Sequence, residues 1–291
     1  MSKKYLEIIM KIVFMTAATA SIIAVALICF FLFINGIPAI GKIGFFDFLF
    51  GLVWAPSDNP PLFGIFPMII GSLYVTAGAI IVGVPIGVLT AIFLAKFCPP
   101  VLYKILKPAT QLLAGIPSIV YGFFGLIVIV PLVRDTFGMT FGGNGQSIFT
   151  ASVLLGIMIL PTIIGISEAA IRAVPESYYE GSIAMGASHE RAVFFVVTPA
   201  AGSGIMTSII LGIGRAIGET MAVILVAGNQ ARMPTGLFRG VRTLTANIVM
   251  EMGYAAELHR EALISTGVVL FVFILMINIL FSLVKRRSPH Q

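Results

Sequence analysis

Long apolar runs recur along this chain of 291 residues, and they constrain its fold more than any other feature. A helix crosses the ~30 Å hydrocarbon core of a bilayer in about 20 residues. On that length, the sequence predicts six membrane spans, at residues 12–35, 66–95, 110–133, 149–170, 203–228 and 262–284. Hydrophobic residues make up 58% of the chain and charged residues only 10%, too few to cover a soluble domain. We therefore expect an all-α integral membrane protein with six transmembrane helices.

Three of these spans have features of their own. The first follows several lysines, as in a signal peptide. It is longer than the ~7–15 apolar residues of a signal sequence, however, and no small-residue cleavage site follows it, so we interpret it as a retained anchor. In the second span, Pro85 predicts a kink or a tilt. In the third, Pro117 after Gly115 predicts a break between an entry turn and the spanning helix.

The lysines and arginines between the spans are divided unequally. Cytoplasmic loops of membrane proteins are rich in these residues, so the larger group marks the cytoplasmic side. If both termini are in the cytoplasm, the larger group of lysines and arginines is cytoplasmic, which favours this orientation. Arg215 belongs to neither group, because it lies within a predicted span. The same residues account for the formal net charge of +6, which therefore does not indicate nucleic-acid binding. The cytoplasmic group is Lys3, Lys4, Lys11, Lys96, Lys104, Lys107, Arg172, Arg191, Lys285, Arg286 and Arg287, and the outer group is Lys42, Arg134, Arg232, Arg239, Arg242 and Arg260.

The spans divide the chain into three parts. Residues 1–65 hold the N-terminal tail, the first helix and an outer loop. Residues 66–284 form a core of five helices with a distinctive loop at 174–200, and residues 285–291 are a basic cytoplasmic tail. In the first outer loop, Trp54 is either an anchor at the membrane interface or part of a docking surface for an external partner.

The loop at 174–200 reads VPESYYEGSIAMGASHERAVFFVVTPA. Its opening Pro-Glu pair is typical of a helix start. We expect this helix to continue to Met185 and to end at Gly186, a residue type that commonly terminates helices. A second helical stretch is expected at 189–197. Two short helices joined at a glycine predict a compact knob on the cytoplasmic face, and residues 174–200 are called the knob below.

The knob resembles the EAA loop of bacterial ABC-importer permeases. That loop reads Glu-Ala-Ala, three residues, Gly, nine residues, Ile, one residue, Leu-Pro. The glutamate, glycine and proline match at the family's spacing, whereas the other positions hold small or similar residues. The corresponding positions are Glu180, Gly181, Ser182, Gly186, Val196, Thr198 and Pro199. Three further stretches resemble the PstC-type permease subunit of the phosphate importer, namely FGIFPMIIGSLYVT (63–76), GIPSIVYGFFG (115–125) and GRAIGETMAV (214–223).

The resemblance implies a MetI-like ABC-importer permease fold with both termini cytoplasmic, in a multi-pass protein of the bacterial inner membrane. It implies a permease subunit of an ATP-driven importer of inorganic phosphate, which forms half of the translocation pathway. The implied partners are a PstA-type paralogue in a heterodimer, a PstB-type ATPase dimer on the cytoplasmic face and a PstS-type phosphate-binding protein on the outer face.

The resemblance also implies that the knob is a coupling helix that enters a groove of the ATPase. Apolar side chains would fill the groove and charged ones would form the rim of the contact. The alternative is an ordinary surface loop between two helices. The implied contact residues are Glu176, Tyr179, Glu180, Gly181, Ser182, Gly186 and Pro199.

The fifth predicted span contains two charged residues, Arg215 and Glu219. Four residues apart on one helix, they would share a face, with Gly212 on the same stripe and Gly218 beside it. A charge inside a membrane costs about 3 kcal/mol or more and marks a buried pair or a pathway. Two interpretations stay open. Either the charges neutralise each other and fix this helix to a neighbour, or the stripe lines the translocation pathway at the subunit interface.

The pathway interpretation suits phosphate. The guanidinium of Arg215 offers a planar fork of donors to phosphate oxygens. Glu219 would weaken that attraction, as conduction requires. Its carboxylate can accept a hydrogen bond from protonated phosphate, which sulfate cannot donate. The external binding protein is the other place where this selection can be made.

Other polar residues are weaker candidates for the pathway. Gln111, Ser118 and Tyr121 surround the break at Pro117, and broken helices at membrane depth commonly line cavities. Glu168 is expected at the interface, at the cytoplasmic end of the fourth span.

The sequence has no nucleotide site of its own, because it contains no Gly-x-x-x-x-Gly-Lys-Ser/Thr motif. We expect a transport subunit that is not an enzyme and holds no cofactor, with ATP and Mg²⁺ on the partner ATPase. No residues have metal-ligand spacing. The remaining reactive side chains are interpreted as structural or solvated, and they are Cys29, Cys98, His189, His259 and His290.

Two other functions stay open. The first is a permease of the same class for another oxyanion, which uptake of labelled phosphate and sulfate would distinguish. The second is a secondary transporter or anion channel that uses Arg215 without ATP. Such a protein needs no knob, and its transport would survive the loss of ATP hydrolysis.

Overall fold

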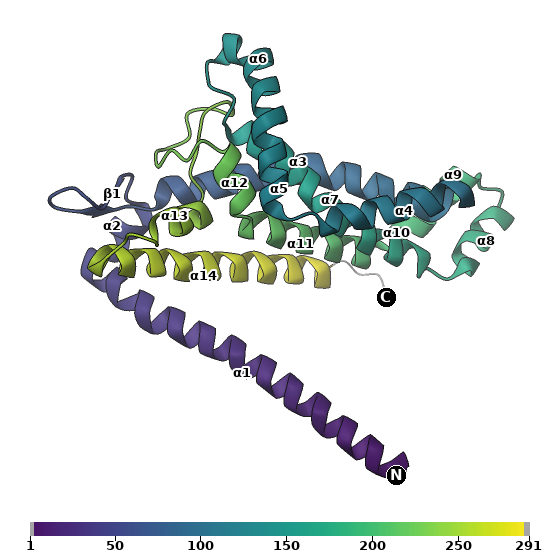
Figure 1. The fold of residues 1–291 in the computed structure, drawn as a ribbon. Coiled ribbons are helices and arrows are strands. Elements are labelled where there is room, and N and C mark those ends of the chain that lie inside the picture. The colour runs from purple at the N-terminus through teal and green to yellow at the C-terminus, as the bar shows by residue number, and fades with distance from the viewer. Residues whose placement is uncertain (1–2, 288–291) are drawn as a thin grey trace.

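The computed structural model describes residues 3–287, and the chain is almost entirely helical (Figure 1). Residues 288–291 of the predicted tail at 285–291, including His290, therefore lie outside the described residues. In chain order the elements are α1 (Lys3–Ile43), α2 (Phe45–Phe50), β1 (Trp54–Ala55), β2 (Leu62–Phe63), α3 (Phe66–Ile92), the π-helical turn η1 (Phe93–Phe97), α4 (Pro100–Gly115), α5 (Ser118–Phe124), η2 (Gly125–Ile129), α6 (Val130–Phe141), α7 (Ile148–Arg172), α8 (Glu176–Ala184), α9 (His189–Ala192), η3 (Val193–Val197), α10 (Thr198–Ala200), α11 (Gly202–Gly218), α12 (Met221–Val226), α13 (Leu244–Glu251) and α14 (Glu257–Arg287).

Five helical segments of the described chain are long and apolar enough to cross a membrane, at 7–43, 66–97, 118–138, 148–172 and 257–280. A sixth span is present if 189–200 and 202–218 count as one, although they meet at a bend of 68°. The predicted all-α membrane fold is confirmed, with five candidate spans, or the predicted six when the bent pair counts as one. Within the second span, α3 continues through Pro85 without interruption.

The predicted break at Pro117 is confirmed, but the segment before it is more than an entry turn. α4 ends at Gly115, and Pro117 caps the start of α5 with extended backbone angles. α4 is a helix of 16 residues, and none of its residues is fully buried. The third span therefore starts at Ser118, about a helical turn or two later than residue 110.

The predicted fifth span, 203–228, is not one continuous helix. α11 ends at Gly218, Glu219 is extended at φ −70° and ψ 131°, and α12 begins at Met221. The Glu219 carboxylate accepts hydrogen bonds from the backbone N–H groups of Thr220 (3.1 Å) and Ala222 (3.3 Å). These bonds satisfy donors that a helix start leaves unpaired, which stabilises the break. The prediction that Arg215 and Glu219 share one helical face is therefore wrong.

The contact between α3 and α7 forms the core of the bundle. Two glycines of α3 allow the two helices to approach closely. A Cβ added at Gly78 would lie 2.2 Å from Ser152 Oγ, and one at Gly83 would lie 2.7 Å from the Ile159 side chain. Small residues let membrane helices approach each other in this way. α11 also packs on α7, and in this buried contact Ser167 Oγ and Ser208 Oγ lie 2.7 Å apart.

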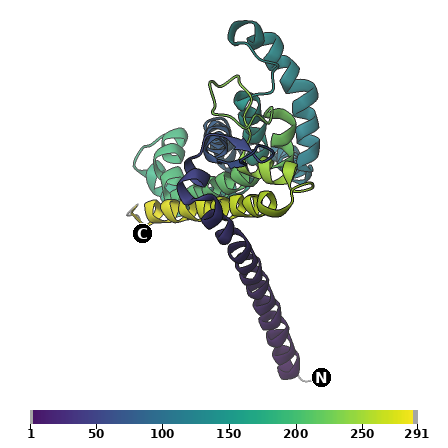
Figure 2. The same ribbon diagram turned by 90° about the vertical axis from the view of Figure 1, so that its left-hand side faces the viewer.

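The bundle has two distinct ends (Figure 1). The knob, which includes α8 and α9, projects at the end of the bundle where α14 terminates. The β1–β2 hairpin, α2 and α13 lie at the opposite end. α1 contacts the start of α14 and then diverges from the bundle (Figures 1 and 2). Most of its side chains along 5–31 are exposed.

Trp54 occupies neither of its two predicted positions. It is buried at the hairpin end, where its indole N–H donates to Glu251 at 2.8 Å. The same carboxylate pairs with Arg242 Nη1 at 2.6 Å and with His259 Nε2 at 2.9 Å. His259 is therefore largely buried among aromatic rings and not solvated as predicted, because a carboxylate eight residues away holds it inward.

Candidate functional site

Arg215 is the charged residue at the break of the fifth span. It lies in the last turn of α11 and is partly exposed. Among the described residues it forms no ion pair, and the nearby Glu219 carboxylate is bonded to the α12 backbone. An unpaired charge inside a hydrocarbon environment is costly, so such residues normally face water, a ligand or another subunit.

The two helix breaks lie close together in the structure. α12, which follows the break at Glu219, packs against α5, which follows the break at Pro117. A Cβ at Gly122 of α5 would lie 3.1 Å from the Ala222 Cα of α12. The hydroxyl of Tyr121 donates to the Leu113 carbonyl at 2.8 Å. Of the polar residues predicted near this break, Tyr121 is thus buried beside it, and Ser118 begins α5.

Glycines leave open space at both breaks. No other atom lies within 4 Å of a Cβ built on Gly115, Gly214 or Gly218. Gly212 differs, because its Cβ would lie 3.2 Å from Ile163 and its role is to seat α11 on α7. Gly218, three residues after Arg215, therefore lies on the open side of α11, whereas Gly212, three residues before it, faces α7.

This arrangement suits the binding of an anion. The Arg215 guanidinium lies at a helix break with no carboxylate of the described chain paired to it, and glycines leave room for a solute beside it. Non-helical backbone at membrane depth is tolerated where it lines a cavity or is buried in protein. At the break near Arg215, Thr245 Oγ1 also donates to the Glu219 backbone carbonyl at 3.1 Å. This carbonyl therefore has a hydrogen-bond donor although the helix does not continue.

The knob has the predicted form of two helices joined at a glycine. α8 ends at Ala184, Gly186 has φ +86°, and α9 starts at His189. Its surface exposes large apolar side chains, with Met185 89% exposed and Ile183 and Tyr178 also exposed.

The predicted contact residues of the knob divide into two groups. Tyr179 points inward, where its hydroxyl lies 2.8 Å from His189 Nδ1, and Glu176, although 60% exposed, pairs with Lys96 of η1 at 3.2 Å. His189 is thus part of the packing and is not free in solvent. The other predicted residues are on the surface or partly exposed, and they are Glu180, Gly181, Ser182, Gly186 and Pro199.

Glu168 was expected at the interface, but the structure buries it with 2% of its side chain exposed. It accepts from Lys107 Nζ at 2.6 Å, Tyr103 Oη at 2.7 Å and Arg172 Nε at 2.9 Å. The hydrogen bond to this carboxylate raises the pKa of the Tyr103 phenol, and burial raises it further. Of the contacts in this cluster, only the pair of Glu168 and Arg172 has a signal in the sequence, which is their spacing of four residues on one helix.

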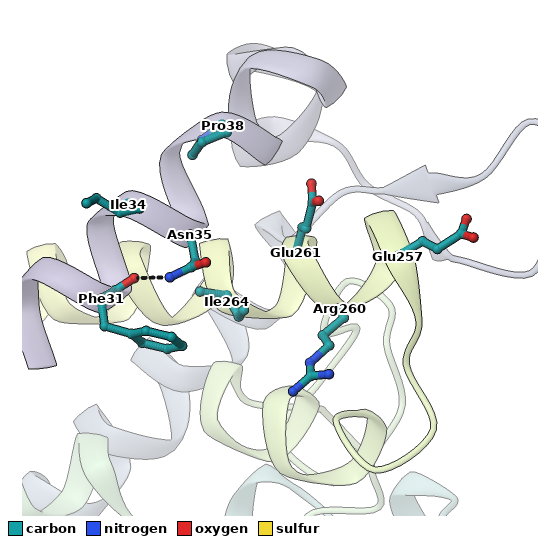
Figure 3. A pocket seen from close by; sticks show the side chains of 8 residues that line it. All are labelled: Phe31, Ile34, Asn35, Pro38, Glu257, Arg260, Glu261 and Ile264. Carbon is teal, nitrogen blue, oxygen red and sulfur yellow. Dashed lines mark hydrogen bonds between the residues drawn. The ribbon is translucent and has the colours of Figure 1, made fainter.

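A pocket of about 490 Å³ lies between α1 and the start of α14, away from both helix breaks (Figure 3). α1 contributes mainly apolar side chains, whereas the first turns of α14 contribute charged ones. Glu261 of this pocket pairs with Lys42 at 2.6 Å. The pocket shares no residue with the surroundings of Arg215, and its lining is Phe31, Ile34, Asn35, Pro38, Glu257, Arg260, Glu261 and Ile264.

Residues 83–288 match the family model described as the binding-protein-dependent transport system inner membrane component. The chain is 39% identical over 255 residues to a Bacillus subtilis protein named Probable ABC transporter permease protein YqgH, and the match covers 86% of this chain and 80% of that protein. It is 35% identical over 281 residues to the phosphate transport system permease protein PstC of Mesorhizobium japonicum, covering 90% and 85% of the two chains.

Solved structures give the same fold at low sequence identity. A chain of the MetNI methionine ABC transporter in an inward-facing conformation matches with a TM-score of 0.61 and 19% identity, covering 78% of this chain and 98% of that chain. A chain of a bacterial alginate ABC transporter, solved with its alginate-bound periplasmic protein, matches with a TM-score of 0.66 and 15% identity, covering 97% of each chain.

Proposed function

This chain belongs to the family of binding-protein-dependent transport system inner membrane components, and on that premise we propose that it is the permease subunit of an ATP-driven importer of inorganic phosphate. Several relatives that match most of the chain are named phosphate transport system permease protein PstC. Their names support phosphate as the cargo. The protein is a multi-pass component of the bacterial inner membrane and a transport subunit.

The observation that carries the proposal is the position of Arg215. The Arg215 guanidinium, which forms no ion pair within residues 3–287, lies at the helix break beside the open glycine Gly218. A planar fork of N–H donors matches the oxygens of a phosphate group. Gly218, Glu219 and Arg215 thus form one part of the pathway, and Gly212 supports it by packing α11 on α7.

An importer of this class works with an ATPase and a substrate-binding protein. The more specific partners that we propose are a PstA-type permease in a heterodimer, a PstB-type ATPase dimer and a PstS-type phosphate-binding protein. ATP and Mg²⁺ would bind to the ATPase, since this sequence has no phosphate-binding loop motif. No role in nucleic-acid binding is proposed.

The knob is the proposed contact with the ATPase. Its exposed apolar side chains, led by Met185, would enter a groove of the partner, and Glu180 would lie at the polar rim. This assignment puts the knob and the end of α14 on the cytoplasmic side, and the β1–β2 hairpin on the outer side, where the binding protein docks.

The test is ATP-dependent uptake by the complete importer. The complex is purified through a tag on this chain, reconstituted in proteoliposomes with its binding protein, and supplied with labelled phosphate or labelled sulfate. We expect phosphate uptake that requires internal ATP. Preferential uptake of sulfate would support a permease for another oxyanion, and uptake that persists without ATP would refute the ABC-importer mechanism.

Glu219→Gln separates two contributions of this side chain. The amide oxygen can still accept from the N–H of Ala222, so α12 should be retained, but the negative charge near Arg215 is lost. We expect phosphate to be held more tightly and its transport rate to fall about tenfold, because conduction requires weak binding. Initial uptake rates for phosphate and sulfate measure this. Unchanged phosphate transport would limit Glu219 to a structural role, and new sulfate transport would assign it to selectivity.

A further inference from the structure

We propose that Glu168 is a positioning residue that transmits movement of the knob to the helix break at Pro117, through α4. This inference rests on the proposed contact between the knob and an ATPase. It identifies the route by which that contact reaches the pathway.

Polar contacts connect α4 to α7. None of its residues is fully buried, and the side chains that are partly buried recur along one stripe that includes Tyr103 and Lys107. These two side chains donate to the Glu168 carboxylate of α7 at 2.7 and 2.6 Å. Hydrogen bonds to an ionised group are the strong ones, and breaking such a buried cluster leaves an uncompensated charge. The position of α4 therefore depends on Glu168.

The same cluster is connected to the knob. Arg172 pairs with Glu168 at 2.9 Å and donates through Nη2 to the Leu94 carbonyl at the start of η1 at 2.8 Å. Further along η1, Lys96 pairs with Glu176 of α8 and lies 5.5 Å from the centre of the Tyr179 ring.

Aromatic packing completes the link between η1 and the knob. The Phe97 ring lies 4.8 Å from the ring of His189 in α9, and His189 bonds to the Tyr179 hydroxyl. Since α8 starts only four residues after Arg172, a displacement of the knob acts on both ends of this network.

The other end of α4 lies at the helix break. α4 ends at Gly115, and the Leu113 carbonyl accepts the hydrogen bond of the buried Tyr121 hydroxyl at 2.8 Å. Tyr121 packs in the same core as Ala216 and Ala222, which flank the break at Glu219. A shift of α4 relative to α7 therefore changes the backbone that borders Arg215.

The experiment measures phosphate transported per ATP hydrolysed, in proteoliposomes that contain the complete importer. Glu168→Gln keeps the shape of the side chain but removes the charge that holds Lys107 and Arg172. We expect the ratio to fall about tenfold, while the amount of copurified ATPase and its hydrolysis without binding protein stay at the wild-type level. Glu168→Asp should restore part of the ratio, and Glu7→Gln, an exposed glutamate of α1, should leave it unchanged.

A second measurement follows the break itself. With the native Cys29 and Cys98 replaced by serine, Gly115→Cys introduces a thiol on the open side of α4. Its rate of maleimide labelling should change on addition of ATP in the otherwise wild-type importer, and this change should be lost with Glu168→Gln. A purely structural role of Glu168 would lower the yield of the complex but would leave both the ratio and the labelling response intact.

The outcomes separate this inference from the proposed function. If the wild-type importer takes up phosphate with ATP and Glu168→Gln is fully coupled, the inference is refuted and the proposed function stands. If the wild type shows no ATP-dependent uptake, the proposed function itself fails. Should Glu168→Gln not fold, Tyr103→Phe and Lys107→Met remove single donors from α4, and normal coupling in both would refute the inference.

Discussion

Replacing Arg215 with glutamine should abolish ATP-dependent phosphate uptake, with a loss on the order of a hundredfold or more. The side chain is partly exposed at the helix break and pairs with no carboxylate among the described residues. A neutral amide of similar length cannot attract a dianion into an apolar span or present two parallel N–H bonds to it. Initial uptake rates in proteoliposomes with internal ATP provide the measurement.

The controls for this substitution address charge, geometry and assembly. Arg215→Lys keeps the charge but loses the planar fork, so it should retain only part of the uptake. Arg134→Gln removes an exposed arginine, 55% exposed beside Asp135, and should have little effect. Equal amounts of copurified ATPase must be present in all preparations. Wild-type uptake by Arg215→Gln would exclude this residue from the pathway.

Gly186→Pro should abolish both the recruitment of the ATPase and phosphate uptake, while the chain still inserts into the membrane. Gly186 has φ +86°, and proline is fixed near −65°, so the turn between α8 and α9 cannot form. The Gly186 N–H also donates to the Ile183 carbonyl at 2.9 Å, a bond that proline removes. Because no other side chain lies within 4 Å of a Cβ at this position, the damage should stay local to the knob.

Two further substitutions define the cause of that loss. Gly186→Ala leaves the N–H in place and strains the backbone by about 1–2 kcal/mol, so it should reduce uptake only in part. Glu180→Lys keeps the turn but reverses an exposed charge, and it should weaken ATPase recruitment if this side chain lies at the contact. Copurification of the ATPase and uptake are measured together. Full recruitment by both Gly186→Pro and Glu180→Lys would rule out the knob as the contact.

The membrane helices could be predicted because span length and hydropathy depend on local sequence alone. The break at Pro117 was also visible, since proline caps a helix start and cannot continue a preceding one. The turn of the knob followed from Gly186 in the same way. In each case one residue type has a backbone preference strong enough to fix the local structure.

The break at Glu219 was not predicted, because glutamate is a good helix former and the surrounding segment 203–228 is mostly apolar. It depends on the Glu219 side chain folding back onto Thr220 and Ala222, and on Thr245, which is 26 residues away. The Glu168 cluster was missed for a similar reason. Its donors Lys107 and Tyr103 lie 61 and 65 residues away in the sequence, and only the tertiary fold brings them to one carboxylate.

The break at Glu219 also changes how the two membrane charges are stabilised. A helix carries partial negative charge at its C-terminal end and partial positive charge at its N-terminal end. Arg215 lies in the last turn of α11, and the Glu219 carboxylate lies at the first N–H groups of α12. Each charge thus faces a helix dipole of the opposite sign, and neither depends on the other for its stability. On the proposed function, Arg215 would therefore exchange one anion for the next without a carboxylate that must first be displaced.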